Sequence, residues 1–373
     1  MLRGSLQIGR IMGIPVRLHF SWFVIFGLIT WLLATQYFPQ VAPDLPRATN
    51  WIRGAVAALL LFLSVIIHEL SHSFVAIRYR IPITSITLFI FGGVAQMKKE
   101  PASPKIELNM ALAGPFSSYV LGLIFFILYK LVGDYSGLKA IASYLFQLNI
   151  ILGTFNLIPG FPMDGGRVLR AILWEKSGDY LSATKKASKI GQGIALIFIF
   201  LGLISIFTGY LGNVWFLLIG WFLYTAAQSS YQQATARGIL SGVRVREVMV
   251  REVISVNAET PVSVLVDDYF LRYGYGGFPV MDSEKIVGII SLKEIKEIPR
   301  DRWTGISVKS VMQQFDDSLI TFEDDDISDT LERMVKEDKG RLIVITNGKM
   351  AGLITRSGIS RYLQMKSALK GQG

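Results

Sequence analysis

The feature that most constrains this chain is a series of six apolar stretches, each long enough or nearly long enough to cross a lipid bilayer as a helix. They cover residues 18–34, 54–77, 108–131, 141–158, 190–207 and 214–227. A bilayer core needs about 20 helical residues. Because lipid offers no hydrogen-bond partner to the backbone, such stretches fold as helices. The sequence therefore predicts a multi-pass α-helical membrane protein with about six spans.

Charge is distributed unevenly along the chain. Residues 1–240 hold 19 Lys and Arg against 8 Asp and Glu, whereas residues 241–373 hold 19 against 20. The basic excess thus belongs to the apolar part, where Lys and Arg flank membrane spans, and does not indicate a nucleic-acid surface. The chain has no cysteine, which excludes a disulfide framework, a thiol nucleophile and a cysteine-based metal site.

The basic residues around the spans also predict the orientation in the membrane. With six crossings, both termini lie on one side. The segments on that side carry 14 Lys and Arg residues and the opposite segments carry 4. Because positive residues accumulate on the cytoplasmic side, we expect a cell-membrane protein with a cytoplasmic N-terminus and a cytoplasmic C-terminal part.

A repeat follows the apolar part. The sequence VREVM at 245–249 recurs as VKSVM at 308–312, and GIIS at 288–291 recurs as GLIT at 352–355. Each copy also has a strand-like run, a turn and a short helical segment, which predicts two α/β units of about 60 residues. We expect a membrane domain over residues 1–240 and repeat units over 243–300 and 305–364.

Two of the three histidines, His68 and His72, lie with Glu69 in the second predicted span, in the sequence HELSH. Ionisable side chains in a membrane helix cost at least a few kcal/mol, so their presence indicates a function. Residues four apart project from the same face of a helix, so the two imidazoles can bind one metal ion. Zinc lowers the pKa of bound water to about 7, and Glu69 lies where a carboxylate can take a proton from that water.

The third protein ligand of a catalytic metal must come from another segment. Asp164 is the candidate, because Pro159, Gly160 and Pro162 are expected to break the fourth span, and irregular backbone at membrane depth occurs only beside protein or a water-filled cavity. The alternative for Asp164 is an N-cap of a helix that begins near Arg167. Two histidines and a carboxylate also describe non-haem iron sites, but the glutamate within HELSH favours one hydrolytic zinc per chain.

At these motifs the sequence resembles the site-2 protease family of intramembrane metalloproteases, over about residues 10–230. The matching residues are His68, Glu69 and His72 in the first family motif and Asn156, Pro159, Asp164 and Gly165 in the second. The resemblance implies a zinc site formed by His68, His72 and Asp164 near the cytoplasmic side. It also implies cleavage of transmembrane or membrane-proximal segments of membrane proteins.

Three further features fit this chemistry. Asn156 can donate its amide to the developing oxyanion, and its alternative is an interhelical hydrogen bond. Residues 83–97, with Gly92 and Gly93 in the middle, predict a membrane-associated β-hairpin whose edge could pair with an unwound substrate; the alternative is a structural re-entrant loop. Gly114 before Pro115 predicts close approach of the third span to the metal-binding helix.

The C-terminal repeat resembles a tandem CBS-domain module, over about residues 243–364. In that family the pair forms a regulatory cleft for adenosine nucleotides, and the ribose-binding pattern is Ser or Thr followed three residues later by Asp. This chain has Ser291 with Glu294 in the first copy and Thr355 with Gly358 in the second. The resemblance implies an adenosine nucleotide or a related ligand at Ser291, Glu294 and Thr355, and control of access or activity. The alternative is a packing or dimerisation module without a ligand, and we expect that any homodimer forms through this pair.

Two other functions explain the sequence less well than a protease does. A CBS-regulated transporter could use the metal site for permeation, but the membrane part shows no internal repeat and transport would not explain the HELSH spacing. A catalytically inactive scaffold is disfavoured because every motif residue is present. We therefore predict an intramembrane zinc endopeptidase whose partners are the lipid bilayer and a membrane-protein substrate, without nucleic acid.

Overall fold

A computed structural model describes residues 4–41, 43, 46–97, 99–133, 136–208, 214–283 and 285–370. Lys98, one of the cations on the predicted cytoplasmic side, lies outside the described residues. The chain divides into two compact units, Met1–Ala234 and Thr235–Gly373. The boundary between the units falls within helix α8 (Trp215–Leu240).

The first unit is built from long apolar helices. They are α1 (Phe20–Leu32), α3 (Arg47–Arg78), α4 (Pro104–Leu131), α5 (Ser136–Asn156) and α7 (Tyr180–Phe207), with the short α2 (Phe38–Val41) after α1 and the polar α6 (Asp164–Ser177) between α5 and α7. Among the described residues, five helices are long and apolar enough to cross a membrane: Phe20–Val41, Arg47–Arg78, Pro104–Leu131, Gly137–Asn156 and Tyr180–Phe207. These five contain most of the first five predicted stretches.

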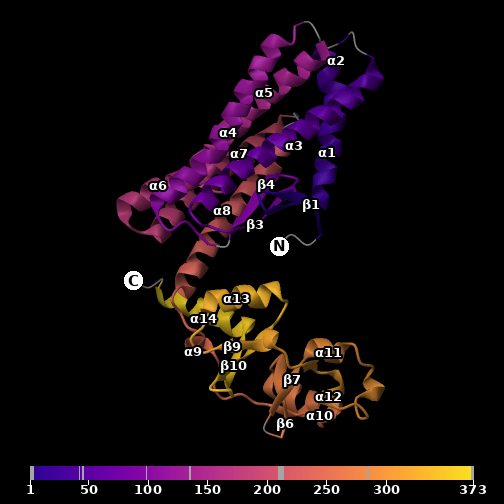
Figure 1. Cartoon of the computed structure of the whole chain (residues 1–373), viewed down its shortest axis with the longest axis vertical. Helices are drawn as coiled ribbons and strands as arrows, with labels where there is room; N and C mark the ends of the chain where they lie inside the picture. The colour runs from indigo at the N-terminus through magenta and orange to yellow at the C-terminus, as the bar shows by residue number, and fades with distance from the viewer. Residues whose placement is uncertain are drawn as a thin grey trace. The chain divides into compact units, whose positions relative to one another are not determined.

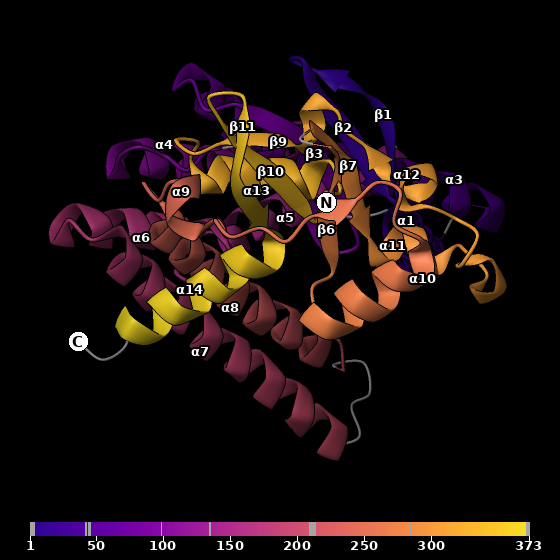
Figure 2. The ribbon, with the colours of Figure 1, turned by 90° about the horizontal axis from the view of Figure 1, so that it is seen from below.

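The sixth predicted stretch lies at the start of α8, which is not one of these five helices. Polar residues begin at Gln228, so the mean hydropathy falls over a window of membrane length. The predicted number of six spans is therefore not confirmed. Helices α7 and α8 run side by side (Figures 1 and 2), and a Cβ at Gly202 of α7 would lie 2.6 Å from Leu217 Cγ of α8.

A four-stranded sheet accompanies the helices, in the order β1 (Ser5–Ile11), β2 (Ile14–His19), β3 (Ile83–Phe89) and β4 (Gly92–Met97). Strands β3 and β4 are antiparallel and turn at Gly92, whose φ of +130° favours glycine, so the predicted hairpin is confirmed. Strand β4 is an edge of this sheet.

The sequence analysis missed β1 and β2. Leu18, the expected start of the first span, lies in β2, and α1 begins at Phe20. His19 is the N-cap of α1, and its Nδ1 accepts a hydrogen bond from the Ser21 backbone N–H at 3.3 Å. The buried residues Ile14, Val16 and Leu18 alternate with less buried neighbours, which is the period of a strand.

Small residues allow α3, α4 and α5 to pack closely, as Figure 1 shows. Ala57, Ala58 and Ala76 of α3 are fully buried. A Cβ at Gly153 of α5 would lie 3.3 Å from the Pro115 carbonyl oxygen of α4. Buried Asn149 of α5 donates a hydrogen bond to the Ser64 hydroxyl of α3 at 3.2 Å. The three helices thus form a tight group around the segment that carries HELSH.

The predicted break after the fourth span is confirmed. Helix α5 ends at Asn156, residues 157–163 form turns, and α6 begins at Asp164. The loop packs against the backbone of α7, because a Cβ at Gly191 would lie 2.0 Å from the Phe161 carbonyl oxygen. This contact fixes the loop that immediately precedes Asp164.

The second unit contains two related sheets. The first is formed by β5 (Val256–Asn257), β6 (Gly277–Asp282), β7 (Lys285–Ser291) and β8 (Gln313–Gln314), and the second by β9 (Ile320–Phe322), β10 (Arg341–Thr346) and β11 (Lys349–Thr355). The antiparallel pairs β6–β7 and β10–β11 each carry one copy of the repeat. The helices are α9 (Val245–Val248), α10 (Val262–Val264), α11 (Leu292–Lys296), α12 (Val308–Val311), α13 (Ile327–Lys336) and α14 (Arg356–Lys370).

The two copies of the repeat share a core. Ile289 and Ile343 belong to one buried cluster with Leu319 and Leu353, although they come from different copies. Figure 2 shows β10 and β11 with α13 and α14 beside them. The second unit is therefore one packed body rather than two independent ones.

Candidate metal centre

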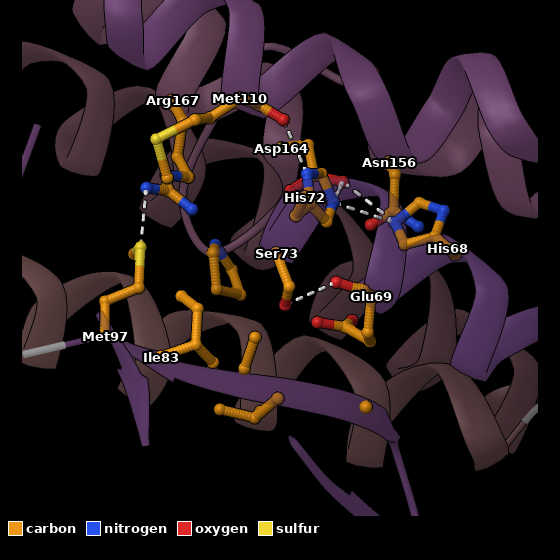
Figure 3. A pocket seen from close by; sticks show the side chains of 14 residues that line it. His68, Glu69, His72, Ser73, Ile83, Met97, Met110, Asn156, Asp164 and Arg167 are labelled. Atoms are coloured by element: carbon orange, nitrogen blue, oxygen red, sulfur yellow. Dashed lines mark hydrogen bonds and ion pairs between the residues drawn. The ribbon is translucent and has the colours of Figure 1, made fainter. Parts of the chain in front are cut away.

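Helices α3 and α6 bring together His68, His72 and Asp164, as Figure 3 shows. The Nε2 atoms of His68 and His72 lie 3.2 Å apart, and each lies 3.1 Å from Asp164 Oδ2. Zinc bound to nitrogen and oxygen at about 2.0–2.1 Å in tetrahedral geometry separates its ligand atoms by about 3.3 Å. The three side chains therefore fit a zinc ion almost without movement.

The outer nitrogens of both imidazoles are held by α4. His72 Nδ1 donates to the Met110 carbonyl oxygen at 2.6 Å, and His68 Nδ1 lies 2.9 Å from the Ser118 hydroxyl. Because a carbonyl oxygen only accepts, Nδ1 of His72 carries a proton, and in the neutral ring Nε2 presents a lone pair. This lone pair and the Asp164 carboxylate converge on one point, which is the donor arrangement that a cation completes.

Asp164 occupies the first position of α6. The N-cap is Met163, whose side chain makes no capping hydrogen bond. The N-cap role that the sequence left open for Asp164 is therefore wrong. Its carboxylate instead faces the two histidines, and its side chain is 14% exposed.

The Glu69 carboxylate faces strand β4. The Ala95 backbone lies close to it. A Cβ at Gly93 would lie only 2.6 Å from Glu69 Cγ, so this end of β4 passes directly over the glutamate. Glu69, both histidines and Asp164 line a cavity of about 210 Å³ together with residues of β4.

Asn156 lies at the end of α5 and lines the same cavity (Figure 3). Its Nδ2 donates to the Leu152 carbonyl oxygen within α5 at 3.0 Å. This bond is intrahelical, and the interhelical role that the sequence left open belongs to Asn149 instead. An amide nitrogen carries two hydrogens, so Asn156 keeps a second N–H for another acceptor.

Helix α4 covers the ligand atoms with its backbone. A Cβ at Gly114 would lie 2.2 Å from His72 Nε2 and 2.6 Å from His68 Nε2, so the predicted close approach is confirmed. The sequence analysis missed Met110 and Ser118 as partners of the histidine rings. A signal was available, since Met110, Gly114 and Ser118 are spaced by four residues and lie on one helix face.

A buried ion pair anchors α6 next to the site. Arg170 Nε donates to Glu107 Oε1 of α4 at 2.8 Å, and the guanidinium lies 4.9 Å from the Phe161 ring centroid and 4.6 Å from that of Tyr180. Burial opposes the charge of Arg170, but the combined interactions with Glu107, Tyr180 and Glu100 outweigh it and raise the pKa of Arg170. This contact joins α6, α4, α7 and the loop before Asp164.

The repeat residues are brought together only in part. Ser291 and Glu294 line a cavity of about 270 Å³ with Arg341 and Arg356 of the second copy. The Glu294 carboxylate accepts hydrogen bonds from the Ser291 N–H and hydroxyl, so the two residues form a capping box. Thr355 does not line this cavity, and its hydroxyl accepts from the Gly358 N–H at 2.9 Å.

Cations dominate the lining of this second cavity. Lys293 and Arg356 lie near Asp338, both at 3.8 Å. Burial lowers the pKa of Arg341, whose guanidinium lies against Gly277: a Cβ there would be 1.6 Å from Arg341 Nη1. The cavity therefore favours an anionic ligand.

Known proteins match both parts of the chain. Residues 56–135 and 130–202 match the peptidase family M50 model, and residues 245–301 and 308–365 match the CBS domain model. Zinc metalloprotease MJ0392 of Methanocaldococcus jannaschii is 34% identical over 98% of this chain and 99% of its own length. Rip3 of Mycobacterium tuberculosis is 32% identical over 98% of this chain and 94% of its own length.

A solved structure, a site-2 protease from Methanocaldococcus jannaschii, is 38% identical and covers 61% of this chain and 95% of its own, with a TM-score of 0.45. The whole-length relatives and the family models establish that the chain belongs to peptidase family M50, the site-2 proteases, with a C-terminal CBS pair. It is a zinc metalloendopeptidase of the membrane, as the resemblance of its motifs implied.

Proposed function

We propose that this protein hydrolyses a peptide bond in a transmembrane or membrane-proximal segment of a membrane protein, with zinc bound by His68, His72 and Asp164. The observation that carries the proposal is the triangle of ligand atoms, with sides of 3.1 to 3.2 Å, combined with the engagement of both Nδ1 atoms by α4. Bound zinc would supply a water of lowered pKa and a Lewis acid for the scissile carbonyl.

Glu69 acts as the general base in this proposal. It accepts a proton from the attacking water and returns it to the leaving amine nitrogen. Its position next to His68 on α3 and its place in the cavity lining support the role.

Asn156 stabilises the oxyanion that develops on the substrate carbonyl. Its bond to the Leu152 carbonyl orients the amide, and the second N–H remains for the substrate. Donors of this kind contribute about 3–4 kcal/mol to transition-state stabilisation.

The edge of β4 holds the substrate in an extended form. Residues Gly93, Val94, Ala95 and Met97 of this strand line the cavity, and β4 is an edge strand of its sheet. The close contact of Gly93 with Glu69 supports a position of this strand beside the catalytic residues. A substrate segment that pairs with β4 by strand addition therefore passes the glutamate.

We also propose that the N-terminus and the CBS pair lie in the cytoplasm. The 14 to 4 distribution of positive residues supports this orientation, with α8 as the sixth crossing. Because the chain has no cysteine, single cysteines introduced at Met12 and Gly242 can be labelled separately. Reaction of either with a membrane-impermeant maleimide in intact cells would contradict the orientation.

The CBS pair binds an adenosine nucleotide in the cavity beside Ser291 and Glu294 and regulates access or activity. The cationic lining supports an anionic ligand, and the resemblance to CBS pairs supports the nucleotide and a homodimer. Because Ser291 and Glu294 satisfy each other, the ribose contact is weaker than in the family pattern, and Thr355 contributes no contact in this cavity. A rise in melting temperature with ATP but not with adenosine is expected.

The decisive experiment combines metal analysis with cleavage of a co-reconstituted membrane protein. Wild type should hold about one zinc per chain and cleave. Glu69→Gln should keep the zinc and lose cleavage, whereas Asp164→Ala should lose the zinc. Glu175→Gln, an exposed glutamate of α6, is the matched control and should behave as wild type. Retained cleavage in Glu69→Gln, or normal zinc in Asp164→Ala, would refute the assigned roles.

A further inference from the structure

Arg167 is a cation in the lining of the catalytic cavity. It lies three residues after Asp164 on α6, and residues three apart share a helix face. Figure 3 shows Arg167 and Met97 on the side of the cavity away from His68. The cavity thus has the metal-binding residues at one end and a guanidinium at the other.

The guanidinium of Arg167 has few partners. Its Nη2 lies 3.9 Å from Met97 Sδ, a weak acceptor, and its Nε lies 3.7 Å from Glu107 Oε1. Arg170 already hydrogen-bonds that same carboxylate oxygen. Within the described part of the chain, no oxygen therefore accepts a hydrogen bond from Arg167, although its side chain is only 17% exposed. A guanidinium has five donors, and those of Arg167 can take a further acceptor in the cavity that it lines.

Strand β4 connects Arg167 to the catalytic residues. Gly93, near its start, lies against Glu69, and Met97, its last residue, lies against Arg167. Four residues of extended chain span about 13 Å. A substrate paired with β4 therefore reaches Arg167 about four residues from the bond that is cut.

We propose that Arg167 is a specificity residue that binds the carboxylate of an Asp or Glu in the substrate, about three to five residues from the scissile bond. This inference rests on the proposed function. The two outer N–H groups of a guanidinium match both oxygens of a carboxylate. Glu107 accepts its hydrogen bonds from Arg170 and lies beyond hydrogen-bond distance of Arg167 Nε, so the outer N–H groups of Arg167 remain for the substrate. Because carboxylates are disfavoured in the bilayer core, the acidic residue marks the membrane-surface end of the cleaved segment.

The test compares Glu with the isosteric Gln in one otherwise uncharged substrate segment, placed in turn at each of about five positions on either side of the mapped scissile bond. In the wild type, one position should give a kcat/KM about tenfold or more higher for Glu than for Gln. In Arg167→Gln that ratio should fall to about one. Arg167→Glu should instead favour Lys at this position. Lys176→Gln, an exposed cation of the same helix, is the control and should keep the wild-type ratio.

The ratio of kcat/KM for Glu over Gln separates a loss of substrate recognition from a loss of overall activity, because both substrates are measured on the same variant. Zinc content reports whether Arg167→Gln folds. If it does not fold, Arg167→Lys replaces it in the test, because lysine keeps the positive charge but lacks the two parallel N–H groups of the guanidinium. The ratio of kcat/KM for Glu over Gln should then fall but stay above one. Binding of uncleaved Glu and Gln peptides to Glu69→Gln gives a second readout, and the preference for Glu should vanish in Glu69→Gln/Arg167→Gln.

Two results would overturn the inference. One is equal cleavage of Glu and Gln substrates by the wild type at every position. The other is an unchanged ratio in Arg167→Gln. Failure of the proposed function is distinct, because then no substrate of either kind is cleaved, while the peptide-binding comparison still reports on Arg167.

Discussion

Replacement of Gly114 by alanine should lower zinc affinity without weakening helix α4. The added Cβ would lie 2.2 Å from His72 Nε2 and 2.6 Å from His68 Nε2. Ordinary contact begins at 3.4 Å, so α4 or the imidazoles must move by about 1 Å. Alanine itself favours a helix by about 1 kcal/mol over glycine. Any loss of zinc affinity therefore comes from the displaced ligands and not from a weakened helix.

The size of the loss in zinc affinity follows from how little the metal–ligand distances of a zinc site can vary. Metal–ligand distances vary by only about 0.2 Å in working sites, and changes to the partners of ligands already cost about 10- to 100-fold in affinity. A shift of about 1 Å in both histidines should cost at least 100-fold, or about 2.7 kcal/mol. Cleavage should fall with zinc occupancy and recover in part at high zinc concentration.

The assay is competition for zinc between the purified protein and a fluorescent chelator, with the melting temperature measured with and without zinc. Gly122→Ala on the same helix is the matched control. Its Cβ meets the flexible end of Ile150 at 2.9 Å, which can move aside, so zinc affinity should stay normal. Wild-type zinc affinity in Gly114→Ala would show that α4 does not pack on the ligand atoms as described.

Three further predictions concern the packing around the site and the repeat. Gly191→Ala, with a Cβ 2.0 Å from the Phe161 carbonyl oxygen, should displace the loop before Asp164 and lower zinc affinity, whereas Gly193→Ala, which meets nothing within 4 Å, should not. Arg170→Met should cost about 3–5 kcal/mol in chemical denaturation because it removes the hydrogen-bonded partner of the buried Glu107 carboxylate, and the double variant with Glu107→Leu should recover most of it. Gly277→Ala, with a Cβ 2.5 Å from the Ile290 carbonyl oxygen, should lower the unfolding midpoint of the CBS unit; an unchanged midpoint would contradict that packing.

Local sequence patterns were sufficient to predict the candidate metal ligands. The HELSH spacing is a property of a single helix, so its geometry can be read without the fold. The helix break before Asp164 follows from Pro159, Gly160 and Pro162, which act on their own backbone. The hairpin turn at Gly92 is local in the same sense.

Features that depend on contacts between distant segments could not be predicted from the sequence. Whether Glu107 pairs with Arg170 depends on how α4 meets α6, which no local pattern encodes. Strand β2 alternates between buried and less buried residues, but it runs directly into the apolar helix α1, so the strand and helix patterns merge around Leu18. Thr355 occupies the position in the second copy of the repeat that Ser291 occupies in the first. Equivalent positions in two copies need not face the same cavity, and only Ser291 lines this one.

The separation of the ligands along the chain has a consequence for how the protein is made. His68 and Asp164 are 96 residues apart. At about 5–20 residues per second, the ribosome needs about 5–20 s to reach Asp164 after it has made His68. During that interval the nascent chain has two ligands and no third. The three candidate ligands can therefore meet only after the long helices α1, α3, α4 and α5 have been made and α6 has docked.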